Sequence, residues 1–400
     1  MKTVKSFYNP PSLILRQAAS ALYFGYLVGW RQLFQWLLQY RKTLPTAAGA
    51  IGMGCIGFPI HPVWEITNAC NLKCEQCHAS SGKPLPNELD TKEGKRLLDG
   101  IANIKEFRML ALAGGEPLLR PDIFELVAYS INLGLEISIA TNGTLLTPEM
   151  AKEFKKMGVA NIAVGLNAND KSIHEQITCV PGSFEKSKRA VYATADAGMG
   201  LQINTTVMKE NREAIPELLS FASEVNAQIV LLYQLVPEGR GEEEMELSIK
   251  EYKALTEMVA ENQKTNRVMI EPTCAPQYWA YLLSLNGHKP SSLSMKLAQT
   301  LFKGCVAGSG LCYIEPDGEV WPCPFIPISG GNVRNTLLSK IWYESEIFQS
   351  LRDRERLIGE KCSSCRFKHI CGGCRGRAYA HSGDYLGDDP LCFLEYSITH

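Results

Sequence analysis

The chain has 400 residues, more than one small core needs, and this length suggests two or three domains. Its 41 Lys and Arg residues nearly balance its 42 Asp and Glu residues, so a formal net charge of -1 provides no basic field for binding nucleic acid. With 45% hydrophobic and 21% charged residues, the composition is that of a folded globular protein. The 14 cysteines are unusual in a long chain without a signal-peptide pattern, and we expect thiolate metal ligands in a reducing cytoplasm rather than disulfides.

Residues 1–58 are expected to form an N-terminal helical extension followed by an Ala- and Gly-rich linker. Their most apolar stretch, residues 17–30, is shorter than the roughly 20 apolar residues that a membrane-spanning helix needs. Trp, Tyr and basic residues continue beyond it, which is typical of helices that lie at a membrane surface. Two alternatives stay open: packing of this helix on its own protein, which we favour, and peripheral membrane contact through residues 13–42.

Residues 59–248 alternate short apolar runs with amphipathic stretches, which is the pattern of a parallel βα sheet. Six strands are too few for a closed eight-stranded barrel but suit a partial (β/α)6 TIM-like barrel, whose active site lies at the carboxyl ends of the strands. The expected strands are residues 63–67, 109–113, 136–140, 161–165, 202–207 and 229–234.

The rest of the chain is expected to divide into a helical linker, residues 249–303, and a C-terminal domain, residues 304–400. In the C-terminal part regular periodicity fades while Cys, Gly and Pro accumulate, so metal ligation is expected to replace part of the apolar core. The predicted fold is therefore an α/β partial barrel between an N-terminal helical extension and a Cys-rich domain.

Three cysteines follow the first expected strand as Cys70-x3-Cys74-x2-Cys77. Three thiolates on one loop can hold three corners of a cubane iron–sulfur cluster and leave its fourth iron open. A structural zinc ion is the alternative, but it needs four protein ligands, and His78 is the one further residue with a claim. The triplet therefore favours an open [4Fe–4S] cluster over zinc.

Two more motifs follow the next two strands, Gly114-Gly115-Glu116-Pro117 and Thr141-Asn142-Gly143. In this order behind the triplet, they resemble the radical S-adenosylmethionine (SAM) enzymes. The resemblance implies that the open iron binds the amino and carboxylate groups of SAM, with the glycine motif at the amino group and the ribose near Asn167. One departure is Gln76, because the family usually has an aromatic residue before the third cysteine. The residues expected to contact SAM are Gly114, Gly115, Glu116, Pro117, Asn142 and Asn167.

Eight further cysteines lie between residues 305 and 392, enough for two closed tetrathiolate sites. Zinc stays an alternative for one of these sites, because four thiolates do not choose the metal. The spacing Cys305-x12-Gly318-x4-Cys323 and the paired cysteines after it resemble the SPASM extension of radical SAM enzymes, which implies two auxiliary [4Fe–4S] clusters and three clusters in all. By position in that pattern, auxiliary cluster I is held by Cys305, Cys312, Cys323 and Cys374, and auxiliary cluster II by Cys362, Cys365, Cys371 and Cys392.

The cysteines outside these patterns are Cys55, Cys179 and Cys274. Unassigned cysteines usually behave as small buried hydrophobes. Cys274, in the stretch 273–278, is also a candidate catalytic residue that would act as a hydrogen donor or contact the substrate.

The resemblance implies an enzyme that cleaves SAM reductively to a 5′-deoxyadenosyl radical, which abstracts hydrogen from a substrate. A ferredoxin- or flavodoxin-like protein would supply the electron, and the auxiliary clusters would accept the electron released by the substrate. A protein that only transfers electrons is a different class, but it would not need the open triplet. We expect a cytoplasmic enzyme, in solution or at a membrane surface.

Local motifs at residues 236–241, 273–278 and 371–385 look like the enzymes of the alternative heme and heme d1 pathways, which trim tetrapyrrole side chains by decarboxylation or deacetylation. The C-terminal stretch also resembles SPASM maturases, which crosslink or epimerise ribosomally made peptides. The aromatic N-terminus leaves a membrane lipid open as a third substrate class. Three arginines are expected either to pair with propionates or to support the clusters, namely Arg240, Arg375 and Arg377.

Overall fold

The structure, a computed structural model, describes Leu22 and residues 61–107, 109–284, 295–296, 298–299 and 304–394. Apart from Leu22, the expected N-terminal extension lies outside the described residues, as do the membrane contact at residues 13–42 and Cys55. None of the helices in the described part combines the length and the apolar character that crossing a bilayer requires.

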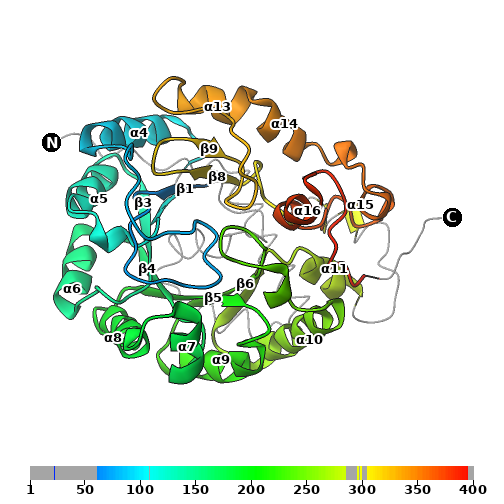
Figure 1. The fold of residues 1–400 in the computed structure, drawn as a ribbon, viewed down its shortest axis with the longest axis horizontal. Helices are drawn as coiled ribbons and strands as arrows, with labels where there is room; N and C mark the ends of the chain where they lie inside the picture. Colours follow the sequence, from blue (N-terminus) through cyan, green and yellow to red (C-terminus); the bar gives the residue numbers. More distant parts are fainter. Residues whose placement is uncertain are drawn as a thin grey trace.

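One nine-stranded sheet, in the order β7-β6-β5-β4-β3-β2-β1-β8-β9, organises the molecule. The seven strands from β1 to β7 are parallel neighbours in chain order, and they curve into an open barrel inside a ring of helices (Figure 1). The predicted α/β partial barrel is confirmed. The strands are β1 (His61–Glu65), β2 (Met109–Ala113), β3 (Glu136–Thr141), β4 (Asn161–Gly165), β5 (Gly200–Val207), β6 (Ile229–Gln234), β7 (Met269–Thr273), β8 (Leu311–Ile314) and β9 (Val320–Trp321).

The helices alternate with the barrel strands and continue into the C-terminal region. They are α4 (Thr91–Asn103), α5 (Ile123–Asn132), α6 (Pro148–Met157), α7 (Lys171–Thr178), α8 (Ser183–Asp196), α9 (Ile215–Glu224), α10 (Ile249–Thr265), α11 (Gln277–Ser284), α13 (Leu338–Glu344), α14 (Glu346–Arg352), α15 (Glu360–Ser364) and α16 (Arg375–Ser382). Local sequence sets their starts, as at α4, where the Asp90 and Glu93 side chains form a reciprocal capping box.

The segment expected to be a helical linker contains a strand, β7, between α10 and α11. Its sequence is Met-Ile-Glu-Pro-Thr, and proline normally argues against a strand because it lacks a donor for the ladder. β7 lies at the edge of the sheet, where one side of the strand needs no partner, and this explains how Pro272 is tolerated. The barrel therefore has seven consecutive parallel strands instead of the six expected.

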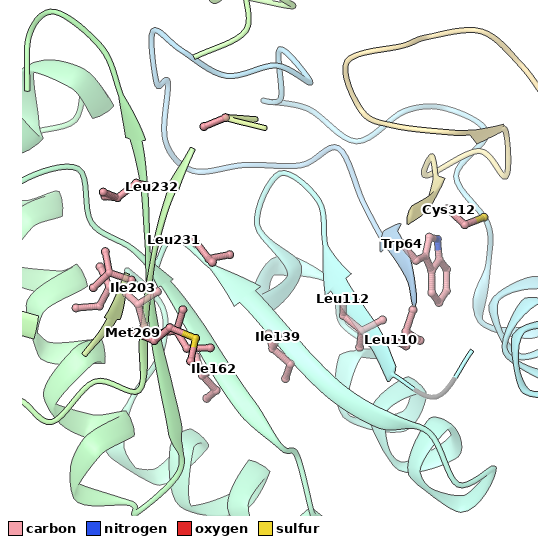
Figure 2. Close-up of a cluster of buried hydrophobic side chains, with 14 of the residues drawn as sticks. Trp64, Leu110, Leu112, Ile139, Ile162, Ile203, Leu231, Leu232, Met269 and Cys312 are labelled. Atoms are coloured by element: carbon pink, nitrogen blue, oxygen red, sulfur yellow. The ribbon is translucent and has the colours of Figure 1, made fainter. Parts of the chain in front are cut away.

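The outer faces of the strands form the main core. Trp64, Leu112, Ile139 and Ile162 are paired across four neighbouring strands and are fully buried (Figure 2). Helix α4 packs so closely on Trp64 that a Cβ at Gly94 would lie 2.8 Å from the indole ring. Burying each such side chain contributes about 2 kcal/mol, which makes this layer the rigid support of the strand ends.

The Cys-rich region is joined to the barrel by the sheet itself. β8 pairs in parallel with β1, and β9 pairs antiparallel with β8. Metal ligation was expected to replace part of the apolar core after residue 304, and this part of the chain also extends the barrel sheet past its first strand.

Candidate functional site

The cysteine triplet lies on a loop with a fixed neck at the carboxyl end of β1. The backbone N–H of Cys70 donates to the Gly82 carbonyl at 3.0 Å, and the Gly82 N–H donates to the Asn68 carbonyl at 3.0 Å. Inside the loop, the Cys77 N–H donates to the Cys74 carbonyl at 3.3 Å. The three thiols are therefore held on one short, hydrogen-bonded loop at the strand ends, where the sequence predicts them.

Arg240 clamps this loop from the barrel side. Its backbone N–H donates to the Cys77 carbonyl at 3.0 Å, its Nε to the Cys74 carbonyl at 2.8 Å and its Nη1 to the Ser81 carbonyl at 3.0 Å. The preceding Gly239 has φ +65°, and a Cβ there would lie 2.1 Å from the His78 carbonyl oxygen. Arg240 thus supports the triplet, which fits the cluster-supporting alternative for this arginine.

The electrostatics of the triplet suit a bound cation. Burial and the neighbouring Cys77 and Cys70 thiols together raise the pKa of Cys74 to about 12. Burial also raises the pKa of Cys70. A bound cation would favour the thiolate forms of such crowded, buried thiols.

The donor set also bears on zinc. His78 Nε2 is hydrogen-bonded to the Tyr313 hydroxyl at 2.9 Å and lies 3.3 Å from Glu65 Oε1, so it is engaged away from the triplet. Among the described residues, no three His, Cys, Asp or Glu side chains are placed to hold a single metal ion. The thiolates around an iron–sulfur cluster bind different irons, so they lie farther apart than the ligands of a single metal ion. Three cysteines without a fourth ligand therefore fit a cluster with one open iron.

The two glycines of the Gly-Gly-Glu-Pro motif are required by backbone contact. The Gly115 N–H donates to the Thr67 carbonyl at 2.8 Å, and the Glu116 N–H donates to the Ala69 carbonyl at 2.7 Å. A Cβ at Gly114 would lie 2.5 Å from the Thr67 oxygen, and one at Gly115 would lie 2.3 Å from the Ala69 oxygen. The motif therefore packs directly against the chain that enters the triplet.

Glu116 ties the ends of β2 and β3 together. Its fully buried carboxylate accepts hydrogen bonds from the Leu118 N–H at 3.0 Å, the Thr141 hydroxyl at 2.8 Å and the Asn142 N–H at 2.7 Å. Burial raises the pKa of Glu116 to about 7. Glu116 thus holds the backbone of Asn142, whose side-chain Nδ2 lies 3.9 Å from Cys70 Sγ, so the structure brings these two expected SAM contacts together with the triplet.

Asn167 lies on the other side of the triplet. Its Oδ1 accepts a hydrogen bond from Gln76 Nε2 at 3.4 Å, and its backbone N–H donates to His174 Nδ1 at 3.2 Å. Its carbonyl accepts from Asn211 Nδ2 at 2.9 Å. Gln76 thus fills the usual aromatic position with an amide that contacts Asn167. The supporting residues His174 and Asn211 were missed because they belong to no motif.

Small or polar residues occupy partly exposed positions near the carboxyl ends of the barrel strands. There, partly exposed positions alternate with buried, outward-facing ones, and Gly165 pairs with Asn204 while Thr206 pairs with Tyr233. The partly exposed positions are Ala113, Ala140, Gly165, Asn204, Thr206, Tyr233 and Thr273.

The cysteines of the C-terminal region gather in two places. A small cavity is lined by Cys362, Cys365, Cys371 and Cys392, the set expected to hold auxiliary cluster II.

In the second place, Cys323 interacts electrostatically with Cys305 and Cys374, three of the four residues expected at auxiliary cluster I. Cys312 is fully buried in the apolar core, and Cys274 lies beside Cys374. The exposed Cys179 caps α7, and its thiol lies 3.7 Å from Glu75.

Arg375 and Arg377 are fully buried and support the C-terminal region instead of facing a substrate. Arg377 binds Asp389 through Nε at 2.8 Å and Nη2 at 3.0 Å. Burial opposes the charge on Asp389, yet Arg377 holds the pKa of that carboxyl below its usual range. Arg375 Nη2 lies 3.6 Å from Cys362 Sγ. Of the two expectations for these arginines, support of the cluster region fits the structure and pairing with propionates does not.

Residues 64–222 match the radical SAM superfamily, and residues 305–366 match SPASM, an iron–sulfur cluster-binding domain. An AdoMet-dependent heme synthase of Methanosarcina barkeri is 38% identical over 332 residues, which cover 82% of this chain and 95% of that protein. One of Nitratidesulfovibrio vulgaris is 35% identical over 337 residues, with 82% and 90% covered. Mycofactocin maturase MftC of Mycobacterium tuberculosis is 28% identical over 347 residues, with 85% and 84% covered.

Solved structures agree on the fold. Streptococcus suis SuiB bound to S-adenosylmethionine superposes with a TM-score of 0.67 at 20% identity, covering 84% of this chain and 78% of that one. The enzyme anSMEcpe with bound AdoMet and a peptide gives 0.62 at 21% identity, covering 83% and 93%. Together with the triplet at the strand ends and the cysteine-lined C-terminal region, these matches establish that the chain is an iron–sulfur enzyme of the radical SAM superfamily with a SPASM domain.

Proposed function

We propose that this radical SAM enzyme removes carboxyl groups oxidatively from the propionate side chains of an iron-bound tetrapyrrole in heme biosynthesis. The observation that carries the proposal is the 38% identity to an AdoMet-dependent heme synthase over 95% of that protein. An Fe-coproporphyrin III synthase is a further relative at 30% identity. Heme carries two vinyl groups where a coproporphyrin carries propionates, so each altered side chain loses CO2, one hydrogen atom to the 5′-deoxyadenosyl radical and one electron, which an auxiliary cluster would accept.

We assign Cys70, Cys74 and Cys77 to a [4Fe–4S] cluster with an open iron, at which SAM binds. When bound and reduced, this cluster supplies the electron that cleaves SAM to the 5′-deoxyadenosyl radical. The glycine motif at residues 114–117 and the Asn142 amide surround the open corner, and Asn167 lies on the ribose side. Burial of Glu116 and its three hydrogen bonds hold this polar wall in place, which supports the assignment.

The barrel wall contributes space and exclusion of water. The small side chains of Ala113, Ala140 and Gly165 leave room for a planar macrocycle beside the triplet. Helices surround the barrel sheet (Figure 1), and an active site inside it would have to limit the access of bulk water to the reacting side chain. Cys362, Cys365, Cys371 and Cys392 are assigned to one auxiliary cluster, and a second draws on Cys305, Cys323 and Cys374.

A ferredoxin- or flavodoxin-like protein is the proposed electron donor, and the cytoplasm is the proposed location. For residues 13–42 we retain peripheral membrane contact, with packing on the protein as the favoured alternative. Sedimentation with anionic liposomes, with and without residues 1–43, separates the two. Loss of binding on deletion together with better soluble yield supports the membrane, whereas a lower yield without any liposome binding supports packing.

The proposed function is tested by anaerobic turnover of the reconstituted enzyme with reductant, SAM and iron-bound coproporphyrin. We expect 5′-deoxyadenosine in proportion to a porphyrin product that has lost CO2 and two hydrogens per altered side chain, measured by mass spectrometry. The variant with Cys70, Cys74 and Cys77 all changed to Ala is expected to lose about four irons and all SAM cleavage. If the wild type cleaves SAM while every tetrapyrrole stays unchanged and a short peptide is modified, the maturase alternative replaces this proposal.

A further inference from the structure

Cys274 lies outside the SPASM cysteine pattern but beside two residues expected at auxiliary cluster I. Its thiol lies beside the thiol of Cys374 and interacts electrostatically with Cys323. Cys323 in turn interacts with Cys305. Four thiols from separate segments therefore gather between the barrel and the C-terminal region: one after β7, one before β8, one after β9 and one at the start of α16.

Buried hydrogen bonds fix the turn that carries Cys274 against the C-terminal region. Arg377 donates from Nη2 to the Cys274 carbonyl at 3.1 Å and is bound to Asp389. Asp389 Oδ2 accepts from Gln277 Nε2 at 2.7 Å and from the Cys374 N–H at 2.7 Å. Because one carboxylate holds both the backbone of Cys374 and a side chain three residues after Cys274, the two thiols keep their relative position.

The chain before Cys305 packs against the same turn. The Gly304 N–H donates to the Ile370 carbonyl at 2.7 Å, and a Cβ at Gly304 would lie 2.6 Å from the Cβ of Pro276. This contact leaves no room for a side chain at residue 304. It brings the Cys305 segment to within van der Waals distance of the turn that carries Cys274.

Cys312 lies on the opposite face of β8 from the barrel interior. Side chains alternate along a strand, and the neighbouring Tyr313 bonds to His78 on the inner side, so Cys312 points outward. There it is fully buried and belongs to the same apolar cluster as Trp64, which Figure 2 draws with it. Its charged neighbour is Arg352 of α14. This is the environment of a core residue.

The backbone at Cys274 is strained. Its φ of +57° lies in the left-handed region, which side chains with a Cβ adopt at a cost. Such conformations persist where the surrounding structure fixes them, and they concentrate at functional sites. Here the strained turn directs the thiol after the edge strand β7 toward Cys374.

We propose that Cys274 is the fourth thiolate ligand of auxiliary cluster I, together with Cys305, Cys323 and Cys374, and that Cys312 is a structural residue of the apolar core. This inference rests on one part of the proposed function, the binding of auxiliary clusters by the SPASM domain. It does not depend on the identity of the substrate. The barrel edge strand then contributes directly to the auxiliary site. The hydrogen-donor role expected for Cys274 is replaced by metal ligation.

The test compares anaerobically reconstituted Cys274→Ser and Cys312→Ser variants of the full chain. Wild type is expected to bind about twelve irons in three four-iron clusters. Cys312→Ser should keep this iron content and the wild-type EPR and Mössbauer spectra. Cys274→Ser should lose between about one and about four irons per chain and, after mild oxidation, show the EPR signal of a three-iron cluster.

A second variant, Cys274→Gly, relaxes the left-handed backbone, so a loss of iron in it reports the thiol rather than strain. Iron loss in both Cys274 variants, with SAM-dependent changes of the first cluster retained, supports the inference. Wild-type iron content in the Cys274 variants, or iron loss in Cys312→Ser alone, overturns it. A wild type that binds no iron contradicts the proposed function itself, and the two failures are therefore distinguished.

Discussion

His174 illustrates how a residue without a motif supports the site. It is almost completely buried, its Nδ1 accepts from the Asn167 N–H at 3.2 Å, and burial lowers its pKa to about 4. The unfolded chain binds a proton near pH 6.5 while the folded chain stays neutral down to about pH 4. The contribution of His174 to stability is therefore complete above pH 6.5 and is lost as the pH falls toward 4.

We predict that His174→Asn, whose side-chain oxygen can replace Nδ1 as acceptor, flattens this pH dependence. Between pH 7 and pH 5 the wild type should lose about 2 kcal/mol of unfolding free energy through His174, and the variant should lose correspondingly less. Urea unfolding of both proteins at the two pH values measures the difference. Parallel curves for wild type and variant would refute the assignment.

Asp389 is the residue on which the C-terminal region depends most. It is fully buried and accepts hydrogen bonds from Arg377, Cys374 and Gln277. Asp389→Asn leaves the buried Arg377 charge uncompensated, and we predict a loss of about 3–5 kcal/mol together with iron from the auxiliary clusters. The exposed pair Arg356–Glu346 is the control, because Glu346→Gln should cost less than about 1 kcal/mol. Equal stability of the two variants by thermal unfolding would contradict this ranking.

At the scale of elements, the loop that carries the triplet depends on the turn at Gly239. An Ala there combines a left-handed φ with a Cβ 2.1 Å from the His78 carbonyl oxygen. We predict that Gly239→Ala displaces the loop and loses about four irons and SAM cleavage. Gly182→Ala is the matched control, since its φ is +78° with nothing within 4 Å, and it should cost roughly 1–2 kcal/mol without iron loss. Iron analysis of both variants tests this prediction. A wild-type iron content in Gly239→Ala would show that the turn before Arg240 does not hold the loop that carries the triplet.

Motifs and periodicity predict the first six strands of the barrel and the position of the triplet, because both are encoded locally. β7 was missed because a proline such as Pro272 normally argues against a strand. Its position at the edge of the sheet, where proline is tolerated, cannot be read from the sequence. The close packing of Gly114 and Gly115 on the carbonyls of Thr67 and Ala69 joins segments that lie far apart in the sequence, so the motif alone does not reveal it. The proximity of Cys274 to Cys374 arises from packing of the turn after β7 against the C-terminal region, which one sequence cannot report.

At the scale of the whole molecule, the C-terminal region and the barrel share one sheet. β1 lies between β2 and β8, with Trp64 paired to Ile314 and Val63 paired to Tyr313. Without β8, β1 would become an exposed sheet edge, and unpaired edges promote aggregation. The fully buried Ile314 alone represents about 2 kcal/mol of lost burial.

We therefore predict different results from removing a cluster and from removing the region that binds it. Cys365→Ala with Cys371→Ala should lose about four irons but still form 5′-deoxyadenosine, because the triplet, the Glu116 network and β8 stay in place. Deletion of residues 304–400 should give an aggregating barrel without SAM cleavage, because the first strand loses its outer neighbour. Size-exclusion chromatography, iron content and 5′-deoxyadenosine yield separate the two. A truncated protein that stays monomeric and cleaves SAM at the wild-type rate would contradict the stabilising role of β8 in the shared sheet. A folded double variant that does not cleave SAM would instead assign auxiliary cluster II to radical formation.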